Sequence, residues 1–300
     1  MHRLWAWIFV LVAGSTGCSH EPWPSPPPVE PSSYQQEHDT WLEGERALLS
    51  EILPIIGIWP LDEGATAFGS DRSLSIVLPA EQVPSIAGTF RRTGHSVTVT
   101  PASDFALRTP DGSRIDRERD VTVVLAGPLR LEVTAVGDDR RWVAATDTTH
   151  PAVTAPPALP SYPLDDQWRV LARFDAFETP KRVRVPDVRG GSMEFTAVGQ
   201  LVFPLDGEER RLTALGTKDG RRFAVWFKDR TNGSTTYGGY REVRTQAVEN
   251  GGWTVIDFNF AYNPPCAYSK FTTCPLSPPE NRLPVAVEAG LKQLPSAKGY

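Results

Sequence analysis

The chain has 300 residues, of which 40% are hydrophobic and 22% charged, a composition that indicates a globular protein and excludes a wholly disordered one. Its net charge of −5 and its pI near 5.6 argue against a general nucleic-acid binder, because such proteins normally carry a basic surplus. The 28 prolines and 24 glycines favour short strands and turns over long helices.

Residues 1–17 are predicted to be a signal peptide. A short positive start precedes the apolar run Leu4–Ala13, which is shorter than the roughly 20 residues that a membrane-spanning helix needs. Small residues then precede Cys18, a pattern that resembles the lipobox of bacterial lipoproteins, although Ser15 stands where that pattern most often has Leu. The resemblance implies that Cys18 is lipidated and becomes the new N-terminus. An ordinary secretory signal with a nearby cleavage site is the alternative.

The signal also predicts where in the cell the protein is located. Ser19 after the cysteine is typical of bacterial lipoproteins sorted to the outer membrane. We therefore expect an exported protein, lipid-anchored in the bacterial cell envelope, on the periplasmic side of the outer membrane rather than at the inner membrane. Residues 18–33 are rich in proline and are predicted to be an extended tether. The expected partner is thus the membrane, through the lipid anchor, and no nucleic acid is expected.

Residues 34–147 are predicted to hold a helix and a small β-sandwich-like unit. Ser33 and Gln36 have the spacing of a capping box, and apolar residues recur at helical spacing over 34–52 before Pro54. The charged residues of this helix, Glu43, Glu45 and Arg46 among them, are expected to face solvent.

Short runs between Gly turns indicate strands over residues 68–147. Their order is similar to that of forkhead-associated-type sandwiches, but the Arg, Ser and His that read phosphothreonine in that family have no match here. An unspecialised β-sandwich is the alternative.

Residues 148–163 form a Pro-rich connector, residues 164–292 a C-terminal antiparallel β unit, and residues 293–300 a tail. Asp-Gly and Asn-Gly turns separate the apolar runs of the C-terminal unit, which indicates a meander of about five strands. The fold class predicted for the whole chain is mainly β, with an N-terminal helix, a β-sandwich-like unit, and then an antiparallel meander sheet or partly closed barrel. The expected strands are Phe195–Phe203, Arg211–Leu215, Phe223–Phe227, Tyr237–Val243 and Trp253–Tyr262.

Polar side chains gather between Trp253 and Pro284. As a strand, Trp253–Tyr262 would place Asp257 and Asn259 on one face, roughly 7 Å apart. Arg241 on the preceding strand could pair with Asp257 at the mouth of a β pocket. A purely structural ion pair is the alternative, because buried carboxylate–Arg pairs are weak evidence for function.

Cys266 and Cys274 lie eight positions apart, and in an exported chain a disulfide is expected between them, worth about 2–3 kcal/mol. No metal site is predicted, because structural zinc needs four ligands and the chain has few histidines. No cofactor fingerprint is present either. Cys266 could act as a nucleophile only with a base, and no histidine lies near it in sequence.

The two runs DFNFAYNPPCAYS and TTCPLSPPENRLPV resemble the C-terminal motif of the bacterial and archaeal family called domain of unknown function 1684. The likeness extends over roughly residues 38–292, with a basic residue common in the family where this chain has Phe260. Because that family has no established activity, the resemblance implies where the domain and its site lie and not which reaction occurs. The upstream motifs that carry it are Trp59, Gly64, Phe68–Ser70, Leu78-Pro79, Tyr162-Pro163, Trp168–Val170, Phe227–Thr231 and Thr236–Arg241.

These observations predict a lipoprotein that binds a small ligand in a polar pocket of the C-terminal β unit. One alternative is a cell-envelope hydrolase that uses Asp257 or Glu280 as acid or base. Another is a structural envelope protein without a ligand, so the sequence leaves open whether the protein is an enzyme. The candidate ligand-binding residues are Tyr237, Arg241, Asp257, Asn259, Tyr262, Asn263, Glu280, Asn281 and Arg282.

Overall fold

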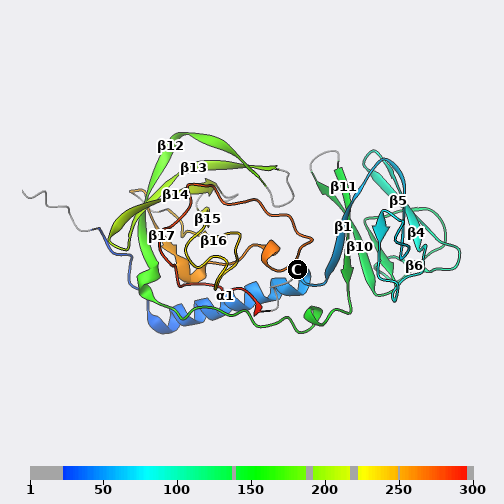
Figure 1. The fold of residues 1–300 in the computed structure, drawn as a ribbon, viewed down its shortest axis with the longest axis horizontal. Helices are drawn as coiled ribbons and strands as arrows, with labels where there is room; N and C mark the ends of the chain where they lie inside the picture. The colour runs from blue at the N-terminus through cyan, green and yellow to red at the C-terminus, as the bar shows by residue number, and fades with distance from the viewer. Residues whose placement is uncertain (1–22, 137–139, 187–191, 217–221, 249–250, 296–300) are drawn as a thin grey trace, which may run out of the picture.

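The computed structural model of the chain describes residues 23–136, 140–186, 192–216, 222–248 and 251–295 (Figure 1). The predicted signal peptide, Cys18 and the first residues of the tether lie outside this part of the chain. The described residues confirm a mainly β protein with one N-terminal α-helix and sheets that are antiparallel apart from one short pair. Within them, we find no helix with the length and apolarity needed to cross a membrane.

The helix α1 (Pro31–Ile52) begins three residues before the predicted start. Glu30 and not Ser33 caps it, because the Glu30 carboxylate accepts hydrogen bonds from the backbone N–H groups of Ser32 and Ser33 at 3.1 and 2.8 Å. Pro31 suits the first helical position, since its fixed φ is already helical and its missing N–H would be unpaired there. The helix ends at Ile52, as predicted from Pro54.

Two sheets build the N-terminal β unit, in the orders β1-β11-β10-β9-β6-β7 and β3-β2-β4-β5-β8. Both contribute to one apolar core, in which the rings of Phe68 and Phe90 stack at 4.7 Å, so the unit is sandwich-like as predicted. The strands are β1 (Ile55–Leu61), β2 (Gly64–Gly69), β3 (Ile76–Val77), β4 (Gly88–Thr93), β5 (Ser96–Pro101), β6 (Leu107–Arg108), β7 (Arg114–Ile115), β8 (Arg119–Asp120), β9 (Val123–Ala126), β10 (Leu129–Val136) and β11 (Arg140–Asp147).

The C-terminal β unit is one curled sheet with the order β16-β15-β14-β13-β12-β17. The sequence missed β12, which pairs with β17 through its first residues and with β13 through the rest. Pro180 interrupts the pattern of β12, and the register shifts between Ala176 and Lys181. The strands are β12 (Arg169–Pro186), β13 (Ser192–Leu205), β14 (Glu208–Gly216), β15 (Phe223–Phe227), β16 (Arg241–Arg244) and β17 (Trp253–Asp257).

This sheet forms a partly closed barrel, which was one of the two predicted forms. Its edge strands approach each other, since the backbones of Glu242 and Tyr262 exchange hydrogen bonds of 2.9 and 2.8 Å. The return segment that follows, residues 283–291, runs inside the curled sheet and buries Leu283, Val287 and Ala289 against the core (Figure 1). The interior is therefore filled by side chains and by the chain's own C-terminal segment.

The last predicted strand, Trp253–Tyr262, is shorter than expected. It ends at Asp257, because the Asp257 carboxylate accepts the backbone N–H of Asn259 at 3.1 Å and caps the short 3-10 helix η3 (Phe258–Phe260). The prediction that Asp257 and Asn259 share a strand face is therefore wrong, although the two side chains do form a hydrogen bond. Another short helix, η4 (Pro265–Ala267), precedes the Cys loop.

The helix α1 packs on the C-terminal unit, although the sequence grouped it with the N-terminal sandwich (Figure 1). The ring of Phe260 lies 5.9, 5.5 and 5.2 Å from the rings of Tyr34, His38 and Trp41. Phe260 thus makes aromatic contacts with three side chains of α1. The two β units have separate cores, joined by a connector with the short helices η1 (Pro151–Val153) and η2 (Asp166–Trp168).

The described part of the tether, residues 23–30, docks on the C-terminal unit. The Trp23 indole N–H donates to the carbonyl of Leu171 at 2.8 Å, and its ring meets Trp253 edge-on at 5.7 Å. Arg169 donates to the carbonyl of Pro27 at 3.2 Å. The described residues of the predicted tether are therefore held against β12 and β17.

Candidate functional site

An open cleft of about 1140 Å³ lies between α1 and the barrel, and we call it the helix cleft. Tyr34, Trp41 and Glu45 line it from α1, while Asp257 and Tyr262 line it from the far end of the chain. Residues more than 200 positions apart in sequence thus share one cavity. The buried charged side chains of Arg169 and Asp257 also line this cleft.

Asp257 is the centre of a buried polar cluster at the floor of the helix cleft. Its Oδ2 accepts hydrogen bonds from the Tyr34 hydroxyl at 2.8 Å and from Arg169 Nε at 3.1 Å. Its Oδ1 accepts from the side-chain amide of Asn259 at 3.1 Å, and that amide also donates to the Tyr34 hydroxyl at 3.0 Å. All four side chains are at least nine-tenths buried. We call these four residues the Asp257 cluster.

Burial dominates the protonation chemistry of the cluster. It raises the pKa of Asp257, while the hydrogen bonds from Tyr34 and Asn259 and the charge of Arg169 oppose the rise. The Arg169 guanidinium also lies 5.4 Å from the centre of the Tyr34 ring. The carboxylate is therefore held in a fixed position with its proton affinity increased, which suits both ligand binding and proton transfer.

The opposite rim of the helix cleft carries a second charged group around β16. Arg244 Nε donates to the Tyr262 hydroxyl at 3.2 Å and to Glu242 at 3.4 Å. Glu242 also accepts the indole N–H of Trp226 at 2.9 Å. Both charges of this rim therefore have partners within the protein.

Glu45 of α1 lies near this rim, where it interacts with Glu242 and Arg244. The sequence placed it in solvent, but it is half-buried and lines the helix cleft. Burial raises its pKa to about 7, repulsion from Glu242 adds to the rise, and Arg244 opposes it. A carboxyl group whose pKa is near neutrality is a typical feature of functional sites.

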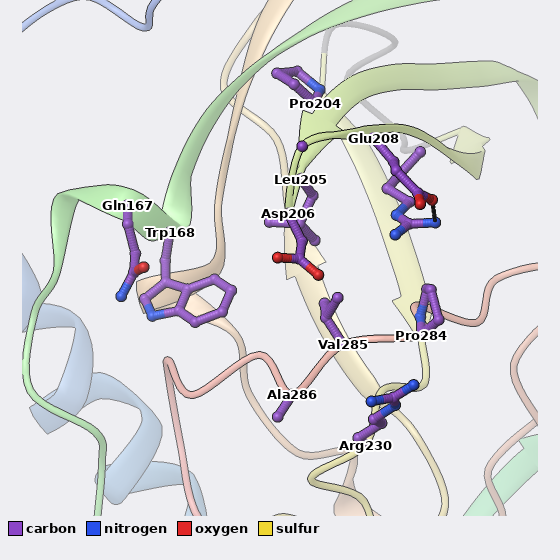
Figure 2. Close-up of a pocket in the computed structure, with 12 residues that line it drawn as sticks. Gln167, Trp168, Pro204, Leu205, Asp206, Glu208, Arg230, Pro284, Val285 and Ala286 are labelled. Carbon is purple, nitrogen blue, oxygen red and sulfur yellow. Dashed lines mark ion pairs between the residues drawn. The ribbon is translucent and has the colours of Figure 1, made fainter.

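A second cleft, of about 890 Å³, lies at the turn between β13 and β14, and we call it the turn cleft. Figure 2 shows Gln167 and Trp168 on one side of it and the turn residues Pro204 to Glu208 on the other. Asp206 and Gly207 have positive φ, as the predicted Asp-Gly turn requires. Glu208 and Arg210 form an ion pair there at 2.7 Å, although Arg210 Nε has no hydrogen-bond partner among the described residues. The turn cleft is the weaker candidate because its polar side chains are exposed or half-buried and form no buried cluster.

Arg241 does not pair with Asp257, contrary to the expectation. It is fully buried, forms an ion pair with Asp229, and donates to the carbonyls of Ala289 and Val287. Arg241 thus fixes the return segment inside the barrel. Its role in the structure is to hold the fold together and not to line the helix cleft.

The other predicted residues divide by location. Asn281 is fully buried and clamps Thr213 and Trp226 through three hydrogen bonds to their backbones. Glu280 is exposed and accepts from the Thr213 hydroxyl at 3.0 Å, so Glu280 and Asp257 bind different elements and do not converge. Three more predicted residues lie away from the Asp257 cluster: Tyr237 is half-buried, the buried Asn263 donates to the carbonyl of Lys292, and Arg282 is exposed.

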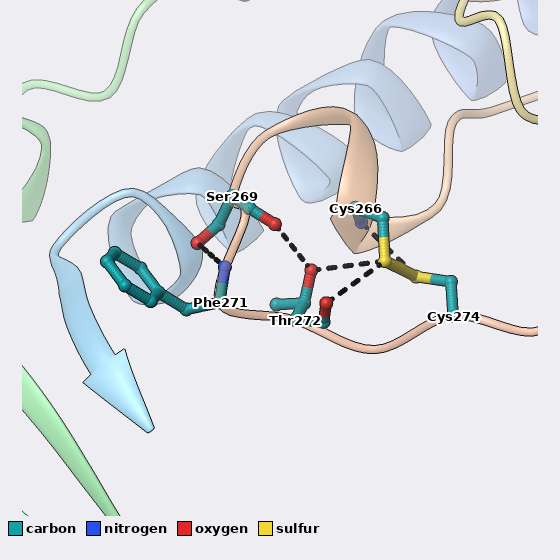
Figure 3. Close-up of a disulfide and its surroundings, with 5 residues drawn as sticks. All are labelled: Cys266, Ser269, Phe271, Thr272 and Cys274. Carbon is teal, nitrogen blue, oxygen red and sulfur yellow. Dashed lines mark hydrogen bonds between the residues drawn. A yellow bond between two sulfur atoms is a disulfide. The ribbon is translucent and has the colours of Figure 1, made fainter. Parts of the chain in front are cut away.

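The predicted disulfide between Cys266 and Cys274 is present (Figure 3). The two Cα atoms are 6.1 Å apart, and the loop is also pinned by the Thr272 hydroxyl, which donates to the Ser269 carbonyl at 2.8 Å. Cys266 is half-buried and Cys274 is buried, and both pack beside Trp226 and Tyr240. The bond therefore rigidifies the loop that follows η4. The described residues include no group of three or more His, Cys, Asp or Glu side chains that could hold a metal ion.

Sequence reasoning missed four residues of the helix cleft, although a signal existed for the three on α1. Tyr34, His38, Trp41, Glu45 and Leu48 follow helical spacing, so Glu45 stands inside an otherwise aromatic and apolar stripe. A carboxylate in such a stripe indicates a buried polar contact or a site. Arg169 carried no comparable signal, because its partner Asp257 lies 88 residues away. The missed residues are Tyr34, Trp41, Glu45 and Arg169.

The comparisons with known proteins concern the C-terminal unit. The family model described as protein of unknown function (DUF1684) matches residues 157–292, so the upstream motifs from Trp59 to Pro79 lie outside the match. A solution NMR structure of an uncharacterized protein from Haloarcula marismortui is 34% identical, and the match covers 45% of this chain and 76% of that chain with a TM-score of 0.39. None of the curated proteins matches the chain. Through residues 157–292, the chain belongs to the DUF1684 family.

Proposed function

We propose that the protein binds a small organic ligand in the helix cleft, as an exported lipoprotein of the cell envelope. The observation that carries this proposal is the Asp257 cluster. Four separate elements, α1, β12, β17 and η3, bring its side chains together beside one open cleft.

The energetics of the cluster favour binding over scaffolding. A buried ion pair adds little net stability, because desolvation of two charges offsets their attraction. Here the Arg169–Asp257 pair is buried yet borders an open cavity, so its polar atoms lie next to where a ligand would sit. Binding sites typically combine such a few fixed polar groups with apolar and aromatic walls.

Two features support export and anchoring. The first 18 residues have the composition of a lipoprotein signal. The Cys266–Cys274 disulfide is of the kind that persists in an oxidising compartment such as the periplasm. A lipid on Cys18, followed by Ser19, would hold the protein on the periplasmic face of the outer membrane.

The test is a thermal-shift screen of the chain from Ser19 onwards, which keeps the docked tether, against amines, sugars, nucleotides and lipid headgroups. A ligand of the helix cleft should raise the Tm of the wild type and lose most of its effect with Asp257→Asn. The matched control is Asp175→Asn, which removes a carboxylate from another Asp–Arg pair on β12, at 39% exposure. A ligand whose shift survives Asp257→Asn would place the binding site elsewhere.

A hydrolase in the same cleft is the second candidate. The favouring observation is that both Asp257 and Glu45 have a raised pKa within one cleft, as a general acid requires. Once a ligand is found, Asp257→Asn and Glu45→Gln separate the two functions. Turnover of the ligand by the wild type, lost in either variant, would favour the enzyme. A ligand recovered intact from the wild type would favour binding alone.

A further inference from the structure

We infer that the helix cleft selects ligands that carry an organic ammonium group, held by the Glu45 carboxylate against the aromatic wall of Trp41 and Tyr262. This inference rests on the proposed function and adds to it the chemical class of the ligand.

The Glu45 carboxylate has no partner of its own. Among the described residues, none donates a hydrogen bond or forms an ion pair to it, although it is half-buried. The charged groups that face it are Glu242 and Arg244 of β16, and Arg244 is already bonded to Glu242 and Tyr262. A half-buried carboxylate beside a second one is an unfavourable arrangement unless a cation joins them.

The arginines of the cleft, by contrast, are all engaged. Arg169 pairs with Asp257, Arg244 pairs with Glu242, and Arg222 also has a partner. An anionic ligand would therefore share these guanidinium groups with their existing partners, and it would face Glu45 and the exposed Glu37. The charges left over in the helix cleft are negative, so charge complementarity favours a cation.

The wall around Glu45 suits an organic cation better than a bare metal ion. Trp41 lies one helical turn before Glu45 on the same face of α1, and Tyr262 lines the cleft opposite. The Trp41 ring is fixed by the ring of Phe260, at 5.2 Å. Aromatic faces attract ammonium groups through the ring quadrupole, and they offer nothing to complete the oxygen shell of a metal ion.

Protonation gives an independent signature of this arrangement. Burial and Glu242 raise the pKa of Glu45 to about 7 in the empty cleft, and the other facing groups are Arg244, Tyr262 and Tyr268. Near that pH part of the Glu45 population carries a proton. Because a bound ammonium group stabilises the ionised carboxylate, binding at neutral pH should release a proton to the buffer, and affinity should rise between about pH 6 and pH 8.

The experiment is isothermal titration calorimetry of the chain from Ser19 onwards with ethanolamine, choline and putrescine as probes. Ethylene glycol is the uncharged comparison. At least one amine should bind the wild type, and Glu45→Gln should weaken its binding roughly tenfold or more. The control Glu43→Gln, an exposed carboxylate on the same helix paired with Arg46, should leave the affinity unchanged. Titrations in two buffers of different ionisation enthalpy should reveal proton release in the wild type and none in Glu45→Gln.

A second variant provides a test that does not depend on the folding of Glu45→Gln. Trp41→Leu keeps an apolar side chain but removes the ring, and it should weaken binding by roughly two- to fivefold. Amine binding that is equal in the wild type and in Glu45→Gln, with both folded, would overturn the inference. So would a neutral or anionic ligand that binds the cleft in an Asp257-dependent way while no amine does, and in that case the proposed function would stand. If no compound binds in an Asp257-dependent way, both would fall.

Discussion

Arg241 and Asp229 form an ion pair whose side chains are both completely buried. The two terminal nitrogens of Arg241 also donate to the carbonyls of Ala289 and Val287, so the pair joins β16 to the return segment. Backbone N–H and hydroxyl of Thr231 both donate to the Asp229 carboxylate. Each partner is therefore satisfied only while the other is present.

Replacing Asp229 by Ala should destabilise the protein strongly. The change would leave the Arg241 charge buried without a counter-ion, and such changes destabilise by about 3–5 kcal/mol. Urea unfolding of both proteins measures the difference. Asp175→Ala is the control, because it breaks an ion pair at 39% exposure of the carboxylate and should lower the free energy of unfolding by about 1 kcal/mol or less. Equal effects of the two substitutions would contradict the structural role assigned to Arg241.

His38 should make the protein sensitive to acid. It is 4% exposed, and neither ring nitrogen has a hydrogen-bond partner among the described residues, so burial lowers its pKa. Below an unfolded-state pKa of about 6.5 the unfolded chain binds a proton that the folded chain does not, and stability falls with pH. Glu45 acts in the opposite sense, because its pKa of about 7 makes the folded state bind its proton first.

The His38 contribution can be isolated by substitution. His38→Phe should reduce the loss of Tm between pH 8 and pH 5, since the aromatic contacts with Trp41 and Phe260 stay while the titrating group is removed. His95→Asn, at an exposed site beside Arg141, should leave that loss unchanged. Thermal unfolding at the two pH values is the measurement. A His38→Phe protein with the same acid sensitivity as the wild type would show that another group controls it.

At the scale of elements, α1 is the element whose packing in the structure differs most from the prediction. Its amphipathic pattern predicted a helix, and the structure has one. The pattern could not say which unit the helix covers, because both β units offer apolar surface. The contacts of Tyr34, Trp41 and Leu49 with the C-terminal unit decide this, and they create the helix cleft.

The loop closed by Cys266 and Cys274 is expected to contribute modestly to stability. Cross-linking a loop of this length restricts the unfolded chain by about 2–3 kcal/mol. The double variant Cys266→Ser/Cys274→Ser should lower the free energy of unfolding by about that amount. The matched comparison is the wild-type protein under reducing conditions, whose free energy of unfolding should equal that of the double variant. An unchanged free energy of unfolding would mean that the cysteines are unlinked in the isolated protein.

At the scale of the whole molecule, the two β units have separate cores and α1 leads from one to the other (Figure 1). Trp23, five residues after Cys18, docks on β12 and β17 of the C-terminal unit. A membrane anchor would therefore act on the unit that contains the helix cleft.

Anchoring is tested in cells that express the full-length chain. Cys18→Ser should move the protein from the membrane fraction to the soluble fraction, because the thioether-linked lipid can no longer form. Cys274→Ser is the control, since it removes a cysteine outside the signal and should stay with the membrane. Membrane association of the Cys18→Ser protein would refute a lipid at this position.

The sequence by itself determined the mainly β fold class, the helix end at Ile52, the Asp206-Gly207 turn and the disulfide, because turns, caps and short loops depend on neighbouring residues. It also pointed to Asp257 and Asn259 as polar residues that meet. Only the tertiary structure decided that Arg169 and Tyr34 complete their cluster, that Arg241 pairs with Asp229, and that β17 joins β12. The contacts of Asp257 with Arg169 and Tyr34 span 88 and 223 positions and the Arg241–Asp229 pair spans 12, and their energies come from burial, which leaves no local sequence pattern.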